Sequence, residues 1–326
     1  MDGYKRIMLT GGSGFVGSYL APAVAAAFPQ AERTVIARPG ETWDDPLWRP
    51  IVVNLTDEAA VERAVRETRP DLVLHLAGQS SVGRALGAAE ETWRVNFHGA
   101  FALASALARH APEAVTLFTS SASVYGDSLR DGAANEDAAL RPLDAYGRSK
   151  AAAEAALTDL LAPDARLIVA RPVNHSGPRQ TSKNFVLASF ASQIVAIESG
   201  RQEPRLMVGD ISKARDFLDV RDVVEAYMLL IAQARTLPER VSHFNVASGA
   251  PRTIRSLLET LRARAHVAFD IEVDPALLRP SSADIASIAC DPARLCAATG
   301  WRQRHTLEDM LQSLLDYWRA IEGAGA

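Results

Sequence analysis

The chain has 326 residues, of which 48% are hydrophobic and 23% charged, and its formal net charge at pH 7 is -4. This composition is typical of a globular protein with one large or two modest domains, and the negative charge argues against nucleic acid as a partner. No apolar run reaches the roughly 18 residues of a membrane span, and residues 1–6 lead directly into an apolar strand. We therefore expect a soluble, cytoplasmic protein that does not bind membranes.

The two cysteines of the sequence, Cys290 and Cys296, stand without a neighbouring cluster of His and Cys. Such a pair fits neither a metal site nor a disulfide framework. We expect no bound metal and two thiols without a chemical role.

A glycine-rich turn follows the first predicted strand. Residues 10–17 read T-G-G-S-G-F-V-G, and the pattern behind them predicts a helix over 18–28. In this position Gly11 permits a tight turn, Gly14 lets the backbone approach a pyrophosphate, and Gly17 lets the helix pack against the sheet. The N-terminus of the helix offers free amide groups and a partial positive charge to phosphates. The stretch therefore predicts a dinucleotide site.

The second predicted strand, residues 34–37, is followed by Arg38 rather than by an acidic residue. Sites that prefer NAD usually carry Asp or Glu here to bind the ribose hydroxyls, whereas a nearby arginine suits the 2′-phosphate of NADP. Arg38 therefore favours NADP. NAD stays the alternative, because a surface arginine would look the same and Glu41 lies only three residues further on.

Strands and helices continue to alternate along the chain. The predicted strands are residues 51–55, 71–78, 114–118 and 167–170, and the predicted helices are residues 58–68, 90–110 and 185–198. The alternation predicts an α/β fold with a parallel, doubly wound sheet. His75 lies inside an apolar strand, so we expect it to be a buried core histidine rather than a catalyst.

A tyrosine and a lysine lie four residues apart at the start of an alanine-rich stretch. Residues 151–157 favour a helix, which would place Tyr146 and Lys150 on one helix face. A tyrosine has an ordinary pKa of about 10, and a nearby cation favours its anion, so such a phenol can exchange a proton with an alcohol or ketone. Ser121 follows a strand, at the sheet edge where doubly wound folds bind ligands, and could hydrogen-bond the same substrate oxygen.

These motifs resemble the extended short-chain dehydrogenase/reductases of the nucleotide-sugar epimerase/dehydratase kind. T-G-G-S-G-F-V-G, H-L-A-G, S-S-A-S-V-Y-G and Y-G-R-S-K occur in the order and at the spacing of that family, over roughly the first 150 residues. The resemblance implies a Rossmann-type doubly wound parallel sheet with a smaller C-terminal α/β substrate domain. It also implies a nucleotide-sugar substrate, an NADP or NAD cofactor and a homodimer built from two helices of each subunit.

The resemblance also implies how the chain divides. Residues 1–172 would form the NAD(P)-binding domain, to which residues 214–248 return. Residues 173–213 and 249–326 would form the nucleotide-sugar-binding domain.

The resemblance assigns roles to individual residues. Tyr146 would be the general acid, Ser121 would hold the substrate oxygen, and Lys150 would bind the nicotinamide ribose and lower the pKa of the tyrosine. The implied cofactor-binding residues are Gly11, Gly14, Phe15, Val16, Gly17, Arg38, Asn54, Leu55, Leu76, Ala77, Gly78, Tyr146, Lys150, Arg171 and Val173. The implied substrate-binding residues are Gln79, Ser81, Ser123, Asn174, Arg215 and Arg279, the two arginines being candidates for the diphosphate.

Within this family, residues 75–82, 171–178 and 277–280 read like those of the GDP-4-keto-6-deoxymannose reductases. Sugar dehydratases of the family carry acidic residues just after the catalytic hydroxyl, and the dual epimerase-reductases carry a cysteine there. This chain has Ala122 and Ser123 at those positions.

Two reactions therefore stay open: reduction of a GDP-4-keto-6-deoxyhexose by NADPH or NADH, and NAD-dependent C4 epimerisation of a UDP-hexose. Arg38 and the whole-chain likeness favour the reductase. A non-catalytic dinucleotide-binding sensor is the third alternative, and the presence of both Tyr146 and Lys150 argues against it.

Overall fold

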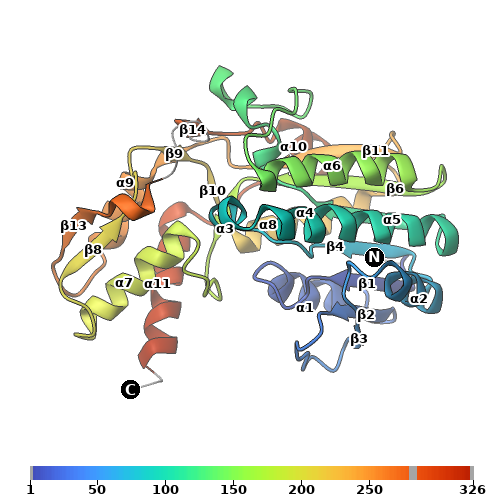
Figure 1. The fold of residues 1–326 in the computed structure, drawn as a ribbon, viewed down its shortest axis with the longest axis horizontal. Helices are drawn as coiled ribbons and strands as arrows, with labels where there is room; N and C mark the ends of the chain where they lie inside the picture. Colours follow the sequence, from blue (N-terminus) through green and yellow to red (C-terminus); the bar gives the residue numbers. More distant parts are fainter. Residues whose placement is uncertain (1–2, 279–284, 324–326) are drawn as a thin grey trace.

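A computed structural model describes residues 3–278 and 285–323. Its largest element is a seven-stranded sheet of order β11-β6-β5-β4-β1-β2-β3, in which every pairing is parallel (Figure 1). The strands are β1 (Arg6–Thr10), β2 (Glu32–Ala37), β3 (Arg49–Val52), β4 (Leu72–His75), β5 (Val115–Thr119), β6 (Arg166–Pro172) and β11 (Val241–Val246). The predicted parallel, doubly wound α/β fold is confirmed.

Helices cover both faces of the sheet (Figure 1). Helices α1 (Gly17–Ala27) and α8 (Val220–Gln233) enclose one hydrophobic core, and α2 (Glu58–Thr68), α5 (Gly99–His110) and α6 (Ala145–Leu160) enclose the other. Successive residues of a strand enter opposite cores, as Leu72 and Val73 do. The inner strands β1, β4, β5 and β6 are almost entirely buried, because helices cover both of their faces, as is typical of parallel sheets, whereas the edge strand β3 is largely exposed.

The helix predicted over 90–110 is interrupted. A short helix α4 (Ala89–Trp93) runs into a π-helical turn at Arg94–His98, and α5 continues from Gly99. Single π turns inside helices often mark functional sites. Here the turn carries Asn96, whose side chain is buried.

A smaller group of elements lies beside the large sheet (Figure 1). It contains α7 (Val186–Glu198), α9 (Ile254–Arg262), α11 (Leu307–Gly323) and the paired strands β8 (Arg205–Val208) and β13 (Asp270–Val273). These helices and β8 share a third hydrophobic core. Short sheets formed by β7 (Asn174–Ser176) with β10 (Phe217–Asp219), and by β9 (Ala214–Arg215) with β12 (Arg252–Thr253) and β14 (Ser287–Ile288), complete the fold.

We propose that the two groups correspond to the predicted domains, with residues 1–172 and 214–248 in one and residues 173–213 and 249–326 in the other. One segment departs from this division. Helix α10 (Ala293–Thr299) contributes Leu295 to a core of the large sheet, and Trp301 joins it there.

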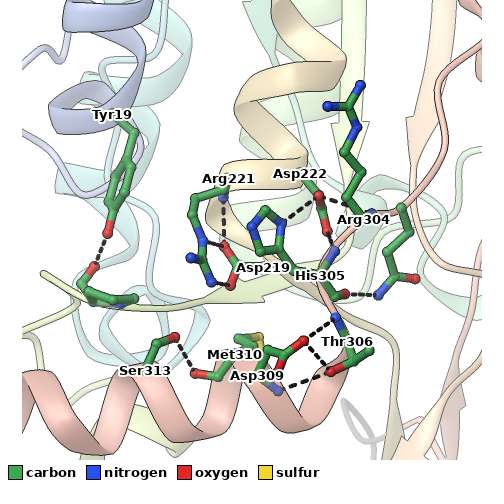
Figure 2. A network of polar contacts seen from close by, with 12 residues as sticks. Tyr19, Asp219, Arg221, Asp222, Arg304, His305, Thr306, Asp309, Met310 and Ser313 are labelled. Atoms are coloured by element: carbon green, nitrogen blue, oxygen red, sulfur yellow. Dashed lines mark hydrogen bonds and ion pairs between the residues drawn. The ribbon is translucent and has the colours of Figure 1, made fainter.

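A polar network fastens α11 to the sheet side of the molecule (Figure 2). The fully buried carboxylate of Asp222, in the first turn of α8, accepts a hydrogen bond from His305 N at 3.0 Å and lies 2.9 Å from His305 Nδ1. Thr306 and Asp309 together cap the start of α11. The Thr306 hydroxyl donates to Asp309 Oδ2 at 2.7 Å and accepts a hydrogen bond from Asp309 N at 3.1 Å. Because a buried carboxylate is stable only when it is hydrogen-bonded, these contacts hold the start of α11 in place.

Within residues 3–278 and 285–323, no helix combines the length and the apolar character that a membrane crossing needs.

Candidate functional site

A cavity of about 990 Å³ is lined by residues at the carboxyl ends of the strands and by residues of the smaller group of elements. Ligand sites in proteins usually measure about 300–1,000 Å³, and open α/β sheets bind their ligands at this edge. One part of the cavity is lined by the glycine turn and the ends of β4 and β5. The opposite part is lined by residues of α7, β8 and the segment around Leu277.

The glycine turn has the close contacts that only glycine allows. Gly11 has a φ of +74°, and a Cβ atom there would lie 2.6 Å from Ala77 N. A Cβ atom on Gly17 would lie 2.2 Å from Gly11 O, whereas one on Gly14 would meet nothing closer than 3.2 Å. Gly11 and Gly17 are therefore sterically required, and the turn leads the chain along the cavity into the N-terminus of α1, whose partial positive charge attracts phosphates.

The cavity brings most of the predicted site residues together. Arg171 is absent from its lining, and Arg279 lies outside the described residues. The predicted residues that line the cavity are Gly11, Gly14, Phe15, Val16, Gly17, Arg38, Asn54, Leu55, Leu76, Ala77, Gly78, Gln79, Ser81, Ser121, Ser123, Tyr146, Lys150, Val173, Asn174 and Arg215.

Tyr146 lies in the first turn of α6, which Asp144 caps by accepting a hydrogen bond from Gly147 N at 2.8 Å. The nearby Ser121 side chain favours the phenolate, but burial has the larger effect and raises the pKa of Tyr146 above its ordinary value. The sequence led us to expect the opposite direction, with the charge of Lys150 lowering this pKa. In the structure burial outweighs the favourable contacts, so the phenol is protonated at neutral pH and suited to act as an acid.

Lys150 lies one turn further along α6 and is also buried. Its Nζ donates a hydrogen bond to the main-chain oxygen of Thr119 at 2.7 Å and lies 4.8 Å from the centre of the Phe118 ring. Burial lowers the pKa of Lys150 to about 8, although the nearby Glu154 carboxylate opposes this change. Lys150 therefore titrates close to physiological pH.

Sequence reasoning missed Asn96, which the π-helical turn directs inward. Its side chain accepts a hydrogen bond from Gln79 N at 2.8 Å and donates to Gln79 O and Ser149 Oγ, both at 3.1 Å. A Cβ atom on Gly78 would lie 2.9 Å from Asn96 Oδ1 and 3.3 Å from Lys150 Nζ. Asn96 thus holds the loop after β4 against α6, and no local pattern signals this because the π turn breaks the helical period.

Arg171 was predicted to bind the cofactor, and the structure places its side chain elsewhere. It donates to both carboxylate oxygens of Glu154, at 3.1 and 2.6 Å, and to Tyr125 Oη and Glu136 O at 3.0 and 3.2 Å. Arg171 and Glu154 are each about 3% exposed. Every guanidinium nitrogen is committed to this buried network, so the side chain cannot also contact a ligand in the cavity.

The end of the cavity beside β2 combines a cation and an anion. The Arg38 side chain is 82% exposed, and its Nη2 lies 3.8 Å from Glu41 Oε1. The Glu41 carboxylate lines the cavity, accepts a hydrogen bond from Arg38 N at 3.0 Å and is also hydrogen-bonded by the hydroxyl of Ser13. This end can therefore attract either a phosphate, through Arg38, or a ribose hydroxyl, through Glu41.

The opposite part of the cavity carries the predicted substrate residues. Arg215 of β9 donates to Ala214 O and Ile285 O, at 2.8 and 2.9 Å, and lines the cavity. Gln79 Nε2 donates to Ser81 O at 2.9 Å, and Ser81 caps the short helix α3 (Val82–Gly87). Lys213 lines the same part, although the sequence did not single it out for this role.

Three further residues have the environments expected of them. His75 is buried, lies 2.8 Å from Thr10 Oγ1 through its Nδ1, and has a pKa lowered to about 3 by burial, so it is a neutral core histidine as predicted. Cys290 and Cys296 are free thiols, and burial raises the pKa of Cys290 to about 12. Among the residues that the structure describes, no cluster of His, Cys, Asp or Glu could hold a metal ion.

Comparisons with known proteins identify the family of the chain. Residues 7–247 match the family described as "NAD dependent epimerase/dehydratase family". The chain is 35% identical to a GDP-6-deoxy-D-mannose reductase of Pseudomonas aeruginosa, over 97% of this chain and 98% of that protein.

Two solved structures illustrate the similarity of the folds. The structure of RMD from Pseudomonas aeruginosa complexed with NADPH has a TM-score of 0.80 and 33% identity, over 97% of this chain and 100% of that chain. A UDP-glucose 4-epimerase of Thermus thermophilus in complex with NAD has a TM-score of 0.80 and 28% identity, over 96% and 99% of the two chains. The resemblance seen in the sequence motifs is confirmed: the chain belongs to the NAD dependent epimerase/dehydratase family, within the extended short-chain dehydrogenase/reductases.

Proposed function

We propose that this protein is an NADPH-dependent nucleotide-sugar 4-ketoreductase. Its substrate would be a GDP-4-keto-6-deoxyhexose, reduced to GDP-6-deoxy-D-mannose or a related GDP-6-deoxy sugar. The observation that carries the proposal is that Ser121, Tyr146 and Lys150 line the same cavity as the glycine turn. The 35% identity to a GDP-6-deoxy-D-mannose reductase supports the choice of sugar and base.

The residues present fit a dinucleotide. The turn at Gly11 and Gly17 excludes any Cβ, and residues 13–17 line the cavity at the positive end of α1, where the pyrophosphate would bind. Arg38 would bind the 2′-phosphate, and Lys150 would bind the nicotinamide ribose. When bound, NADPH supplies the hydride for the C4 carbonyl carbon.

The protein's own residues would control the proton. Tyr146 is protonated because burial raises its pKa, so it can donate its proton to the C4 oxygen as negative charge develops there. Ser121 would hold the same oxygen, and Lys150 would stabilise the phenolate left on Tyr146. Arg215 and Arg279 would bind the diphosphate, because a guanidinium matches phosphate oxygens in pairs.

A second candidate is NAD-dependent C4 epimerisation of a UDP-hexose. It needs the same Tyr146 and Lys150 and a tightly held NAD, and Glu41 at the ribose end of the cavity favours that cofactor. The 28% identity to a UDP-glucose 4-epimerase is consistent with it. The reductase is preferred because the identity to the GDP-6-deoxy-D-mannose reductase, 35%, exceeds the 28% identity to the epimerase, and because Arg38 is present.

We also propose a homodimer formed through the helices on the α5 and α6 side of the sheet. Trp93, Phe97 and Phe101 form a row of half-buried aromatic rings in this region, with the Phe97 and Phe101 centroids 6.2 Å apart. Covering these rings would remove apolar surface from water.

The test measures the loss of NADPH absorbance after purified protein is mixed with NADPH and GDP-4-keto-6-deoxymannose. The same assay is run with NADH. UDP-galactose without added cofactor is the parallel assay. Stoichiometric oxidation of NADPH with formation of a GDP-6-deoxyhexose supports the reductase. Interconversion of UDP-hexoses without oxidation of NADPH would overturn it in favour of the epimerase.

A further inference from the structure

Three consecutive residues at the end of β5 are each joined to a different turn of α6. Thr119 O accepts a hydrogen bond from Lys150 Nζ at 2.7 Å, and the Ser121 side chain lies near enough to the Tyr146 phenol to favour its phenolate form. Between these two contacts, the hydroxyl of Ser120 donates to Glu154 Oε1. The helix partners lie four residues apart and therefore on one helix face.

The middle contact differs from the other two. Ser120, Ser121, Tyr146 and Lys150 line the cavity, and Glu154, the partner of Ser120, does not. Ser120 is 2% exposed and Glu154 is 3% exposed, so this contact lies in the protein interior, behind the reacting groups. Because the Ser120 hydroxyl is donated to the buried Glu154 carboxylate, it is engaged with α6 although Ser120 borders the cavity.

Glu154 is held by more than Ser120. Arg171 of β6 bonds both of its carboxylate oxygens, and Arg171 is itself bonded to Tyr125 Oη at 3.0 Å. The carboxylate is thus fixed relative to β6 as well as to the end of β5. Several hydrogen bonds hold the buried Glu154 carboxylate in one position. They therefore also fix the position of α6, which carries Glu154.

We propose that Ser120 and Glu154 are positioning residues, which set the register of α6 against the end of β5 so that Tyr146 meets Ser121 and Lys150 meets Thr119. The proposal rests on the catalytic role given to Tyr146 and Lys150 in the proposed function. It gives the two adjacent serines different tasks, Ser121 toward the substrate and Ser120 toward the helix. Glu154 also supplies negative charge near Lys150, which favours the ammonium form of that lysine.

The first experiment compares Ser120→Ala with Thr116→Val in the full chain. Thr116 lies on the same strand, is fully buried, and its hydroxyl lacks a hydrogen-bond partner among the described residues, so Thr116→Val removes a buried hydroxyl outside the contact. In Ser120→Ala we expect kcat to fall about tenfold with both KM values nearly unchanged, because small displacements of reacting groups reduce kcat steeply. Thr116→Val should keep the kcat of the wild type. Equal kcat values in the two variants would overturn the proposal.

The second experiment requires no substrate. The sequence contains four lysines, so the side-chain signals of a protein labelled with ¹³C-lysine are few, and Lys150→Arg identifies the signal of Lys150. We expect this signal to titrate with a pKa near 8 in the wild type and at lower pH in Glu154→Gln, which removes the charge that favours the ammonium ion. In Ser120→Ala the titration should change because a displaced α6 alters the distance between Lys150 and Thr119 O. An unchanged titration in both variants would overturn the proposal.

The two experiments separate this inference from the proposed function. A wild type that turns over no nucleotide sugar would count against the reductase alone, because the lysine titration still measures how Ser120 and Glu154 act on Lys150. Glu154→Gln leaves the charge of Arg171 unbalanced and can fail to fold, whereas Ser120→Ala leaves that ion pair in place. If Glu154→Gln is insoluble, Ser120→Ala alone therefore tests the positioning role.

Discussion

The Nζ atom of Lys150 donates a hydrogen bond to the main-chain oxygen of Thr119 at 2.7 Å, in a buried place where the Glu154 carboxylate favours its charged form. Because burial disfavours the ammonium ion, the pKa of this lysine falls to about 8. The positive charge beside Tyr146 is therefore present at neutral pH and is lost as the pH rises through that value.

The pH dependence of kcat/KM should reflect this lysine. We expect a basic limb near pH 8, since kcat/KM reports the ionisation of the free enzyme and the pKa of Tyr146 is raised above its ordinary value. The limb should vanish in Lys150→Arg, whose charge persists at every accessible pH, although the residual rate will be low. A limb near pH 10 in the wild type, or the same limb in Lys150→Arg, would exclude Lys150 as its source.

Replacing Tyr146 by Phe removes the proposed acid and little else. We expect kcat to fall by about 10²- to 10⁴-fold, the usual contribution of a general acid, while the Kd for NADPH stays within about threefold. Tyr4→Phe is the matched control, because it removes a tyrosine hydroxyl bonded to Ile231 O outside the cavity. Steady-state kinetics and NADPH fluorescence titration measure the two quantities. Turnover of Tyr146→Phe at the control's rate would contradict the role of the phenol.

Arg171→Met should destabilise the protein rather than weaken cofactor binding. The substitution leaves the Glu154 carboxylate buried without its ion-pair partner, which typically costs about 3–5 kcal/mol of unfolding free energy. Urea denaturation measures the loss, and NADPH titration of the remaining folded protein should give a Kd close to that of the wild type.

The double variant Arg171→Met/Glu154→Leu is the control for this prediction. It removes both charges together, so it should recover part of the lost stability. A stable Arg171→Met protein with a weakened affinity for NADPH would instead support the role first predicted from the sequence.

Arg38 and Glu41 should have opposite effects on the choice of cofactor. Arg38→Ala is expected to raise the Kd for NADPH about tenfold and to leave the Kd for NADH unchanged, because a charge-assisted hydrogen bond to the 2′-phosphate contributes about 1.5–3 kcal/mol. Glu41→Gln should lower the Kd for NADPH, since it removes a carboxylate 3.8 Å from the Arg38 guanidinium that would repel a phosphate there. Titration of each variant with NADPH and with NADH measures the Kd values. Equal changes in the two Kd values would contradict the prediction.

Gly17→Ala should prevent cofactor binding or folding. Its Cβ atom would lie 2.2 Å from Gly11 O and 2.5 Å from Gly12 O, and these backbone atoms cannot move without opening the turn. Gly87→Ala, at the end of α3, is the control, because a Cβ atom there meets nothing within 4 Å. Circular dichroism and NADPH titration separate loss of fold from loss of binding. An NADPH affinity equal to that of the control would show that the turn tolerates a side chain.

Local patterns in the sequence were sufficient for much of the fold and for part of the site. The glycine turn, the Tyr146 and Lys150 pair and the alternation of apolar strands with helices all depend on spacing within about twenty residues, which the chain displays directly. The helix over 58–68 begins and ends where it was predicted, because Asp57 caps one end and Arg69 takes a left-handed conformation at the other. The helix over 90–110 was predicted as continuous, and its π turn had no local signal.

The sequence by itself determined the class of the fold and the dinucleotide turn and indicated the proposed reacting groups, because each rests on residues close together in the chain. Only the tertiary structure decided that Arg171 pairs with Glu154 instead of a ligand, and that burial raises rather than lowers the pKa of Tyr146. Both outcomes depend on neighbours supplied by distant segments and on how far each group is removed from water. The neighbours of a group and the extent of its burial are set only when the chain packs, so no sequence motif indicates them.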